Sequence, residues 1–302
     1  MVRVVAAAVV LAGCSFHAHE LVNDATGDAI DARDSDGPAI DSDGDGVADG
    51  DDNCPTAANA DQANEDGDDR GDACDLCPHL AGTVPGSDDD DDGDGIGNQC
   101  DPRVGTDRRV VFLPFNDPHD LDKIALRAGS NQWSISNGAL HQTDATVTTP
   151  QNVVWTGEDI NGPVVVESQI HLDSVPAGTG TRLAAVEGGY YDGTTVDVYA
   201  CGLRGSDAEV AATVGAWHFV NPPTIGTSTT AATTGTITAG KQAHAYLRAT
   251  LTDPYNSQLD CAADASTATL PVGGYIPAGY PGFRTLGVTA SFDYLFVVAI
   301  GS

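Results

Sequence analysis

The sequence predicts a mainly β protein in which irregular, disulfide-linked repeats precede an antiparallel two-sheet β-sandwich, or jelly roll. Three observations lead to this prediction. Acidic residues recur at fixed spacings over 41–101, and six further cysteines follow Cys14. From residue 110 onward, short runs of β-branched and aromatic residues alternate with turn residues. Helical periodicity is nearly absent, and 302 residues are enough for two folded units.

The negative charge is concentrated in the N-terminal third of the chain. Of 44 acidic residues, 26 lie within 20–101, where Arg33 and Arg70 are the only basic residues. The whole chain has a formal net charge of -31. Such repulsion disfavours a compact state unless cations neutralise it, and it excludes nucleic acid as a partner.

The first 13 residues have the features of an export signal. Arg3 provides a basic start, and the apolar run over 4–11 is too short to span a bilayer. The segment ends in Leu-Ala-Gly-Cys at 11–14, which resembles a bacterial lipobox. This resemblance implies a lipid on Cys14 and an exported protein anchored at the cell envelope, in the outer membrane or at the cell surface. The alternative is an ordinary signal peptide cut after Gly13, which leaves a free thiol.

Residues 14–40 are predicted to form a flexible tether. They contain few large apolar side chains and many Asp, Ala and Gly, so they cannot bury enough surface to offset the entropy of ordering. The acidic segment ends at a change in composition near Asp101-Pro102. The predicted organisation is therefore a leader at 1–13, a tether at 14–40, acidic repeats at 41–102 and a sandwich at 103–302.

Three windows of the acidic segment share the spacing of a twelve-residue loop. Oxygen-bearing side chains stand at positions 1, 3, 5, 9 and 12, and position 7 would add its backbone carbonyl. Alternate residues of a tight turn converge on one point, and Ca²⁺ takes six to eight oxygen ligands. We therefore expect calcium ligands at Asp41, Asp43, Asp45, Val47, Asp49 and Asp52, at Asn64, Asp66, Asp68, Arg70, Asp72 and Asp75, and at Asp90, Asp92, Asp94, Ile96, Asn98 and Asp101.

Two other interpretations of these acids, an EF-hand and a solvated linker, compete with the predicted calcium loops. An EF-hand needs an amphipathic helix on each side and Glu at position 12, whereas the three windows end in Asp52, Asp75 and Asp101 between Pro, Asn and Gly. A run such as 88–92 is equally well explained as a solvated, self-repelling linker. That explanation does not account for the first window, because random acidity does not produce its spacing followed by a cysteine pair.

The residues between the loops carry a family resemblance. The first window continues into Asp52-Asn53-Cys54-Pro55, then Asn59 and Gln62, and the second window closes with Gly-Asp-Ala-Cys-Asp at 71–75. A less complete copy runs from Leu-Cys-Pro at 76–78 to residue 101. Over roughly sixty residues this resembles thrombospondin type 3 repeats. The resemblance implies a chain wound around structural calcium ions with disulfides that join its turns.

The second window departs from the pattern of that family. Asp69 stands at position 6, where the first and third windows have a glycine suited to a sharp turn, and Asn64 replaces an acid at position 1. Asn98 replaces an acid in the third window. We therefore expect the second site to bind calcium less tightly than the first.

Seven cysteines are an odd number for an exported protein. A lipid on Cys14 leaves six, which allow fifteen connectivities. Alternate pairing across the first four is the main rival to the pairing that local context favours, which joins Cys54 to Cys74, Cys77 to Cys100 and Cys201 to Cys261.

Segments at the two ends of the C-terminal region carry a second family resemblance. They are Phe-Asn-Asp at 115–117 with 133–140 at the opening, and 282–285 with 292–294 at the close. These segments resemble concanavalin A-like lectin and glucanase (LamG-like) domains. Strand-like runs between them include 164–171, 194–203 and 244–251. We expect Trp133 and Phe292 to pack in the core.

The resemblance includes both enzymes and binding proteins, so the fold does not decide the function. Retaining glycoside hydrolysis needs two carboxylates ~5 to 5.5 Å apart, but the glutamates of this region are isolated and no catalytic triad pattern is found. We therefore expect a lectin-like adhesion domain that binds a glycan or a surface protein. The alternatives are a polysaccharide-active glycoside hydrolase and a spacer without a small ligand. Aromatic and planar polar candidates for a ligand site are Tyr190, Tyr191, Asp192, Trp155, Trp217 and His218.

Overall fold

The computed structural model describes residues 40–82, 89–177, 180–191, 196–206, 213–220, 224–232, 237–253, 256–263, 265–273 and 279–301. The predictions for the leader, for Cys14 and for the tether up to residue 39 lie outside the described residues. Contacts join Ile40–Ser302 into one unit. In the part of the chain that is described, no helix has the length and apolarity needed to cross a bilayer.

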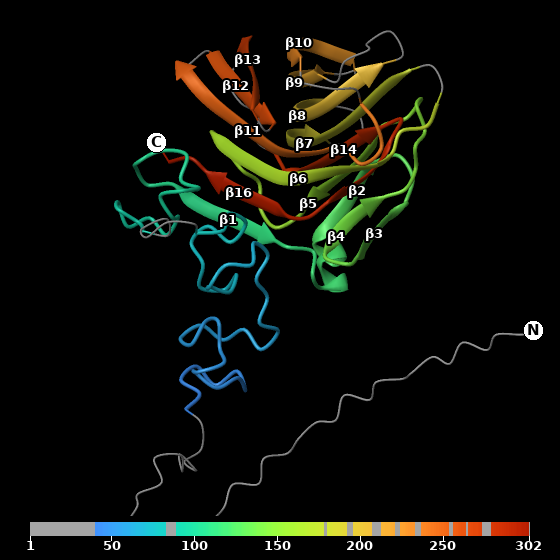
Figure 1. Ribbon diagram of the computed structural model, residues 1–302. Helices are drawn as coiled ribbons and strands as arrows, with labels where there is room; N and C mark the ends of the chain where they lie inside the picture. The colour runs from blue at the N-terminus through green and yellow to red at the C-terminus, as the bar shows by residue number, and fades with distance from the viewer. Residues whose placement is uncertain are drawn as a thin grey trace, which may run out of the picture. The chain divides into compact units, whose positions relative to one another are not determined.

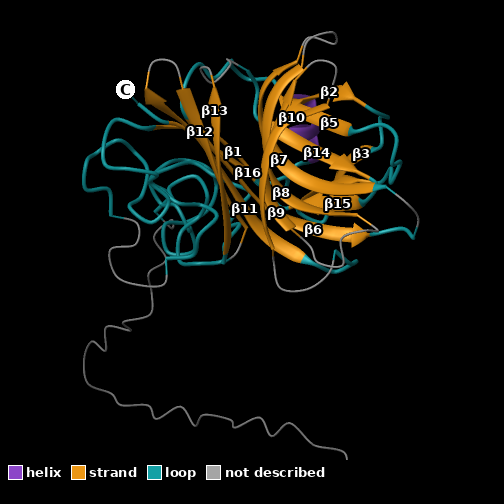
Figure 2. Ribbon diagram, turned by 90° about the horizontal axis from the view of Figure 1, so that it is seen from above, coloured by secondary structure: helices purple, strands orange, loops and turns teal. Residues whose placement is uncertain are grey.

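Two antiparallel sheets form the predicted sandwich (Figure 2). In the nine-stranded sheet, seven strands lie side by side, β16 pairs with β6, and β1 pairs with β16. The seven are, in spatial order, β13 (Ser266–Gly273), β12 (Asn256–Ala263), β11 (Gln242–Asp253), β6 (Val164–Ser174), β15 (Thr289–Phe292), β4 (Ala139–Gln142) and β3 (Trp133–Ser136), and the other two are β16 (Leu295–Ala299) and β1 (Arg108–Leu113).

The second sheet has seven strands, and a short 3₁₀ helix, η1 (Pro118–Lys123), precedes its edge strand. Asp117 caps this helix by accepting a hydrogen bond from the backbone N–H of His119. The strands are, in spatial order, β10 (Thr224–Ala232), β9 (Thr213–Val220), β8 (Val196–Ser206), β7 (Thr181–Tyr191), β14 (Gly282–Leu286), β5 (Gln151–Trp155) and β2 (Ile124–Ala128).

The core lies between the sheets because side chains of each strand alternate between its two faces. On β7, Ala184 and Val186 belong to the main core, whereas Leu183 and Ala185 belong to a smaller cluster on the outer face, the face turned away from the core. Trp133 and Phe292 are buried with ring centroids 6.2 Å apart, as predicted.

The three disulfides in the described part of the chain confirm the pairing that local context favoured. Two lie in the acidic segment, as Cys54–Cys74 and Cys77–Cys100. The third, Cys201–Cys261, connects β8 of one sheet to β12 of the other. It therefore ties the two layers together through the core.

The described residues of the acidic segment before β1 contain neither helix nor strand. In its later part, drawn in teal, the segment lies next to β1 (Figure 1). Its second disulfide and Ile96 pack in a cluster with Val165, Tyr294 and Phe296 on the outer face of the nine-stranded sheet. Cys77, Leu80, Ile96 and Cys100 therefore attach this part of the acidic segment to the outer face of the sandwich.

Candidate functional site

The three acidic loops share one pattern of hydrogen bonds from backbone to side chain. The side chain at position 1 accepts a hydrogen bond from the backbone N–H of position 4. In the same way, the side chain at position 3 accepts from the N–H of position 5, and the side chain at position 5 accepts from the N–H of position 7. The side chain at position 9 accepts from the N–H of position 2. The donor–acceptor distances are 2.7 to 3.2 Å in the first loop, 2.7 to 3.1 Å in the second and 2.7 to 3.4 Å in the third. The structure thus repeats in the same register as the sequence.

The carboxylate at position 5 of each loop is also fixed by a later segment of the chain. Its second oxygen accepts a backbone N–H from thirteen or fourteen residues downstream. The pairs are Asn59 to Asp45 at 2.7 Å, Gly82 to Asp68 at 2.8 Å and Asp107 to Asp94 at 2.8 Å. Each loop is therefore held in place by the segment that follows it.

The side-chain oxygens of each loop converge. In the first loop, Asp41, Asp43 and Asp45 each offer an oxygen within 4.8 Å of the other two. The same holds for Asp66, Asp68 and Asp75 in the second loop and for Asp90, Asp92 and Asp94 in the third. Three clusters of oxygen ligands therefore lie where the spacing predicts calcium.

Several buried oxygens at the expected ligand positions have no hydrogen-bond partner. Among the described residues, these include Oδ2 of Asp43, Asp52 and Asp72. A buried carboxylate oxygen without a partner is costly, and a hard cation held by oxygen ligands would satisfy it. The donor set therefore fits Ca²⁺.

Burial and neighbouring carboxylates shift the pKa values of several loop carboxyls. Burial, with the charge of Asp66 adding to it, raises the pKa of Asp72 to about 6. Desolvation also raises the pKa of Asp94 and Asp101. In contrast, the N–H of Gly95 holds the pKa of Asp90 below its usual range. A cation among these groups would favour their charged forms.

The second loop differs at position 1, where the sequence has an amide. In the other two loops, the second oxygen of Asp41 or Asp90 accepts the N–H of the glycine at position 6, at 3.1 and 2.8 Å. Asn64 has only one oxygen, and its Nδ2 donates instead to the backbone carbonyl of Asp68 at 2.8 Å. A carboxylate at position 1 thus occurs together with a glycine at position 6 in the first and third loops, where the two groups are hydrogen-bonded.

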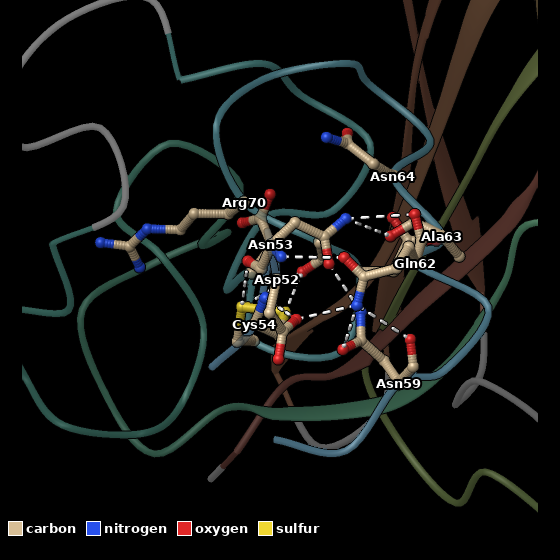
Figure 3. Close-up of a disulfide and its surroundings, with 12 residues drawn as sticks. Asp52, Asn53, Cys54, Asn59, Gln62, Ala63, Asn64 and Arg70 are labelled. Carbon is tan, nitrogen blue, oxygen red and sulfur yellow. Dashed lines mark hydrogen bonds between the residues drawn. A yellow bond between two sulfur atoms is a disulfide. The ribbon is translucent and has the colours of Figure 1, made fainter. Parts of the chain in front are cut away.

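Position 12 of the first loop is held by two residues that entered the sequence analysis only as part of a family pattern. Gln62 donates to Oδ1 of Asp52 at 2.8 Å and accepts the backbone N–H of Asn53 at 2.9 Å (Figure 3). Asn59 donates to Oδ1 of Asn53 at 2.7 Å. Gln62 and Asn59 therefore position the ligand next to the first disulfide.

A glycine at position 4 of each loop was not among the residues predicted from the sequence. Gly44, Gly67 and Gly93 have φ of 83°, 73° and 78°, a region that side chains other than glycine rarely adopt. In the second loop, position 4 has this conformation although position 6 is Asp69. The signal was visible, because all three windows have glycine at position 4.

The predicted ligand-site residues are not all described. Tyr190 and Tyr191 end β7 with side chains outside the described part, and Asp192 lies outside it altogether. Trp155 is half-buried at the end of β5, and His218 pairs with Asp197 at 2.6 Å. Trp217 is fully buried.

Trp217 lines a pocket of about 140 Å³. The pocket lies on the outer face of the seven-stranded sheet, where Trp217, Leu183 and Phe219 form an apolar cluster. The guanidinium of Arg284 also lines it and lies 4.5 Å from the centre of the Phe219 ring. The site thus combines apolar walls with a planar cation.

Glu187 lies next to this pocket, where it pairs with Arg284 at 3.7 Å and accepts a hydrogen bond from Asn152. Burial raises its pKa to about 7, although Arg284 opposes the shift. On its face of β7 its neighbours are Ala185 and Gly189. Glu167 lies on β6 of the other sheet.

No protein-family model and no curated protein matches the sequence. Solved structures resemble this chain in outline, and three of them serve as examples. The carbohydrate recognition domain of Emp46p, in its potassium-bound form, has a TM-score of 0.41 at 12% identity over 60% of this chain and 91% of its own. Lectin II from Ulex europaeus has a TM-score of 0.43 at 9% identity, and the match covers 63% of this chain and 98% of the lectin. The carbohydrate-binding module CBM66 from Bacillus subtilis has a TM-score of 0.37 at 13% identity, and the match covers 57% of this chain and 92% of the module.

With scores this low, these likenesses carry no argument about ligand or activity. The architecture rests on the strand pairing of this chain itself, which forms an antiparallel two-sheet sandwich. The proteins that it resembles in outline include lectin-type and carbohydrate-binding domains and also an endo-β-galactosidase from Clostridium perfringens.

Proposed function

We propose that this chain is an exported calcium-binding lipoprotein that presents a glycan-binding β-sandwich at the cell surface. The observation that carries the calcium part is the hydrogen-bond pattern common to the three loops, in which the carboxylates are held around one point. Calcium has a structural role in this proposal. It neutralises the acidic segment and fixes the loops, because carboxylate oxygens are its preferred ligands.

Calorimetric titration of the full chain with Ca²⁺ tests this part. Asp45→Asn removes charge from a ligand position of the first loop and is expected to weaken binding at that loop. Asp51→Asn is the matched control, because Asp51 is exposed, lies in the same loop and is not an expected ligand. Absence of calcium uptake by the unmodified chain, or equal effects of the two substitutions, would contradict the proposal.

For the glycan part, the pocket beside Trp217 supports binding. Its apolar walls suit the faces of sugar rings, and Arg284 offers a planar donor group to hydroxyl or carboxylate groups. A glycan array with and without calcium tests it. Leu183→Phe would fill the pocket and is expected to abolish binding, whereas Leu251→Phe, at an exposed site on the other sheet, is the control. A blank array would favour a spacer without a small ligand.

We propose binding rather than hydrolysis. The lone carboxylate on the outer face of β7 supports this choice, because retaining hydrolysis needs a second carboxylate close by. Release of reducing sugar from a panel of β-glucans tests it. If Glu187→Gln abolished such release, a glycoside hydrolase would be the better description.

The lipid anchor is proposed from the sequence around Cys14 alone. Cys14→Ser is expected to move the protein from the membrane fraction to the soluble fraction. An unchanged distribution would contradict the anchor and would leave the calcium and glycan proposals untouched.

A further inference from the structure

A histidine of the acidic segment meets a glutamate and a histidine of the sandwich. His79 Nε2 lies 3.3 Å from Glu167 Oε2, and His244 Nε2 lies 2.9 Å from the same oxygen. Glu167 comes from β6 and His244 from the neighbouring strand β11. Ligand atoms of the three residues lie within 4.8 Å of one another.

The cluster is enclosed on the side of the acidic segment. The side chain of His79 is 0% exposed and that of Glu167 is 3% exposed. Aromatic rings surround His79, with ring centroids of Phe296 and Tyr294 at 4.2 and 5.0 Å. Among the described residues its Nδ1 has no hydrogen-bond partner, so the ring is held through Nε2, the nitrogen that faces Glu167.

The geometry points to a site for a divalent transition-metal ion, with Zn²⁺ the best fit, held by His79, Glu167 and His244. Zinc binds imidazole nitrogen and carboxylate oxygen at about 2.0 to 2.2 Å, so tetrahedral ligands lie about 3.3 Å apart. The distance from His79 Nε2 to Glu167 Oε2 is 3.3 Å. The distance from His244 Nε2 to the same oxygen is 2.9 Å, so a small outward shift of the imidazole would bring it to the value for a zinc site. Zinc would replace the protons shared between these groups.

The ligand types separate this site from the acidic loops. Two imidazoles and one carboxylate suit zinc and similar metals, whereas Ca²⁺ prefers oxygen ligands alone. The side chain of His244 is 33% exposed, so water can reach the fourth coordination position from that side. Because His79 follows Cys77 in the acidic segment, the ion would clamp this segment to the nine-stranded sheet.

Zinc titration of the full chain tests this inference. The chain carries Cys14→Ser, which removes both the proposed lipid and the thiol that would otherwise compete for zinc, and it is saturated with calcium so that the acidic loops are filled. Calorimetry is expected to show one tightly bound zinc per chain, and X-ray absorption at the zinc edge to show imidazole ligands. Glu167→Gln and His244→Gln should each lose that zinc, whereas His119→Gln should keep it, because His119 is exposed on η1.

Three results would overturn the inference. They are no saturable zinc in the parent chain, zinc retained by both ligand variants, and an absorption spectrum with oxygen ligands only. The spectrum uses the parent chain, so it decides the matter even if a ligand variant fails to fold. None of these results bears on calcium binding, which is measured separately.

Discussion

Individual residues in the acidic loops have conformational roles as well as ligand roles. The carboxylates that converge in each loop are oriented by backbone N–H groups, and those groups point inward because a glycine at position 4 adopts positive φ. The glycine at position 4 and the carboxylate at position 1 are therefore coupled through this hydrogen bond.

Gly44→Ala is expected to weaken calcium binding at the first loop by roughly tenfold. Its φ of 83° costs an L-residue about 1–2 kcal/mol, although a Cβ there would meet no atom within 4 Å. Gly50→Ala is the matched control, because the space is equally open and its φ is not in the left-handed region. Calcium titration of both variants measures the effect, and equal losses would argue against a conformational cause.

Glu187 gives a residue-scale prediction for pH. Its pKa is about 7 in the folded chain and near 4.5 when unfolded. Because the folded state favours the protonated acid, the unfolding free energy contributed by Glu187 is highest below pH 4.5. It falls as pH rises to about 7, by a few kcal/mol at most.

Urea unfolding between about pH 5 and 8, in saturating calcium, measures this contribution. Glu187→Gln does not titrate, so the wild type should lose stability relative to the variant as pH rises. Parallel pH profiles for the two proteins would show that Glu187 does not titrate in this range.

Among the elements, the three loops form a series in which the second is the outlier. Its amide at position 1 has one oxygen where a carboxylate has two, and Asn64 supplies no charge. Calcium affinity rises with the charge of the ligand set. The expected weakness of the second site thus has a structural reason, although the affinities themselves are a prediction.

Restoring the pattern should strengthen the second loop. Asn64→Asp with Asp69→Gly adds a charge and lets the N–H of position 6 reach the new carboxylate, as in the first and third loops. The affinity of the weakest calcium site is expected to rise on the order of tenfold. Asp69→Gly alone is the control and should have a smaller effect. A calcium titration in which the double variant matches the wild type would refute this explanation.

At the scale of the whole molecule, the acidic segment and the sandwich share buried surface. Ile96 occupies position 7 of the third loop, is 1% exposed, and packs with Phe296 and Val298 of β16. Arg109 of β1 donates to the backbone carbonyl of Asp75 at 2.8 Å. Ordering of the loops therefore contributes to the stability of the sandwich.

Ile96→Ala is expected to lower the unfolding free energy of the molecule by about 2 to 5 kcal/mol, the usual cost of a cavity in a packed cluster. Val47→Ala is the control, because Val47 has the same position in the first loop and is only half-buried. Urea unfolding in calcium measures both. A loss from Ile96→Ala no larger than that from Val47→Ala would show that the third loop does not stabilise the sandwich.

The features encoded within short windows could be predicted from the sequence. The loop register and the strand pattern depend on residues close in the chain, so spacing predicted them, whereas the cysteine pairing was favoured by local context and decided by the structure. Only the tertiary structure decided that the third loop covers the nine-stranded sheet, and that His79 lies against Glu167 and His244. Strand order and the path of the chain bring these distant residues together, and neither is encoded in local spacing.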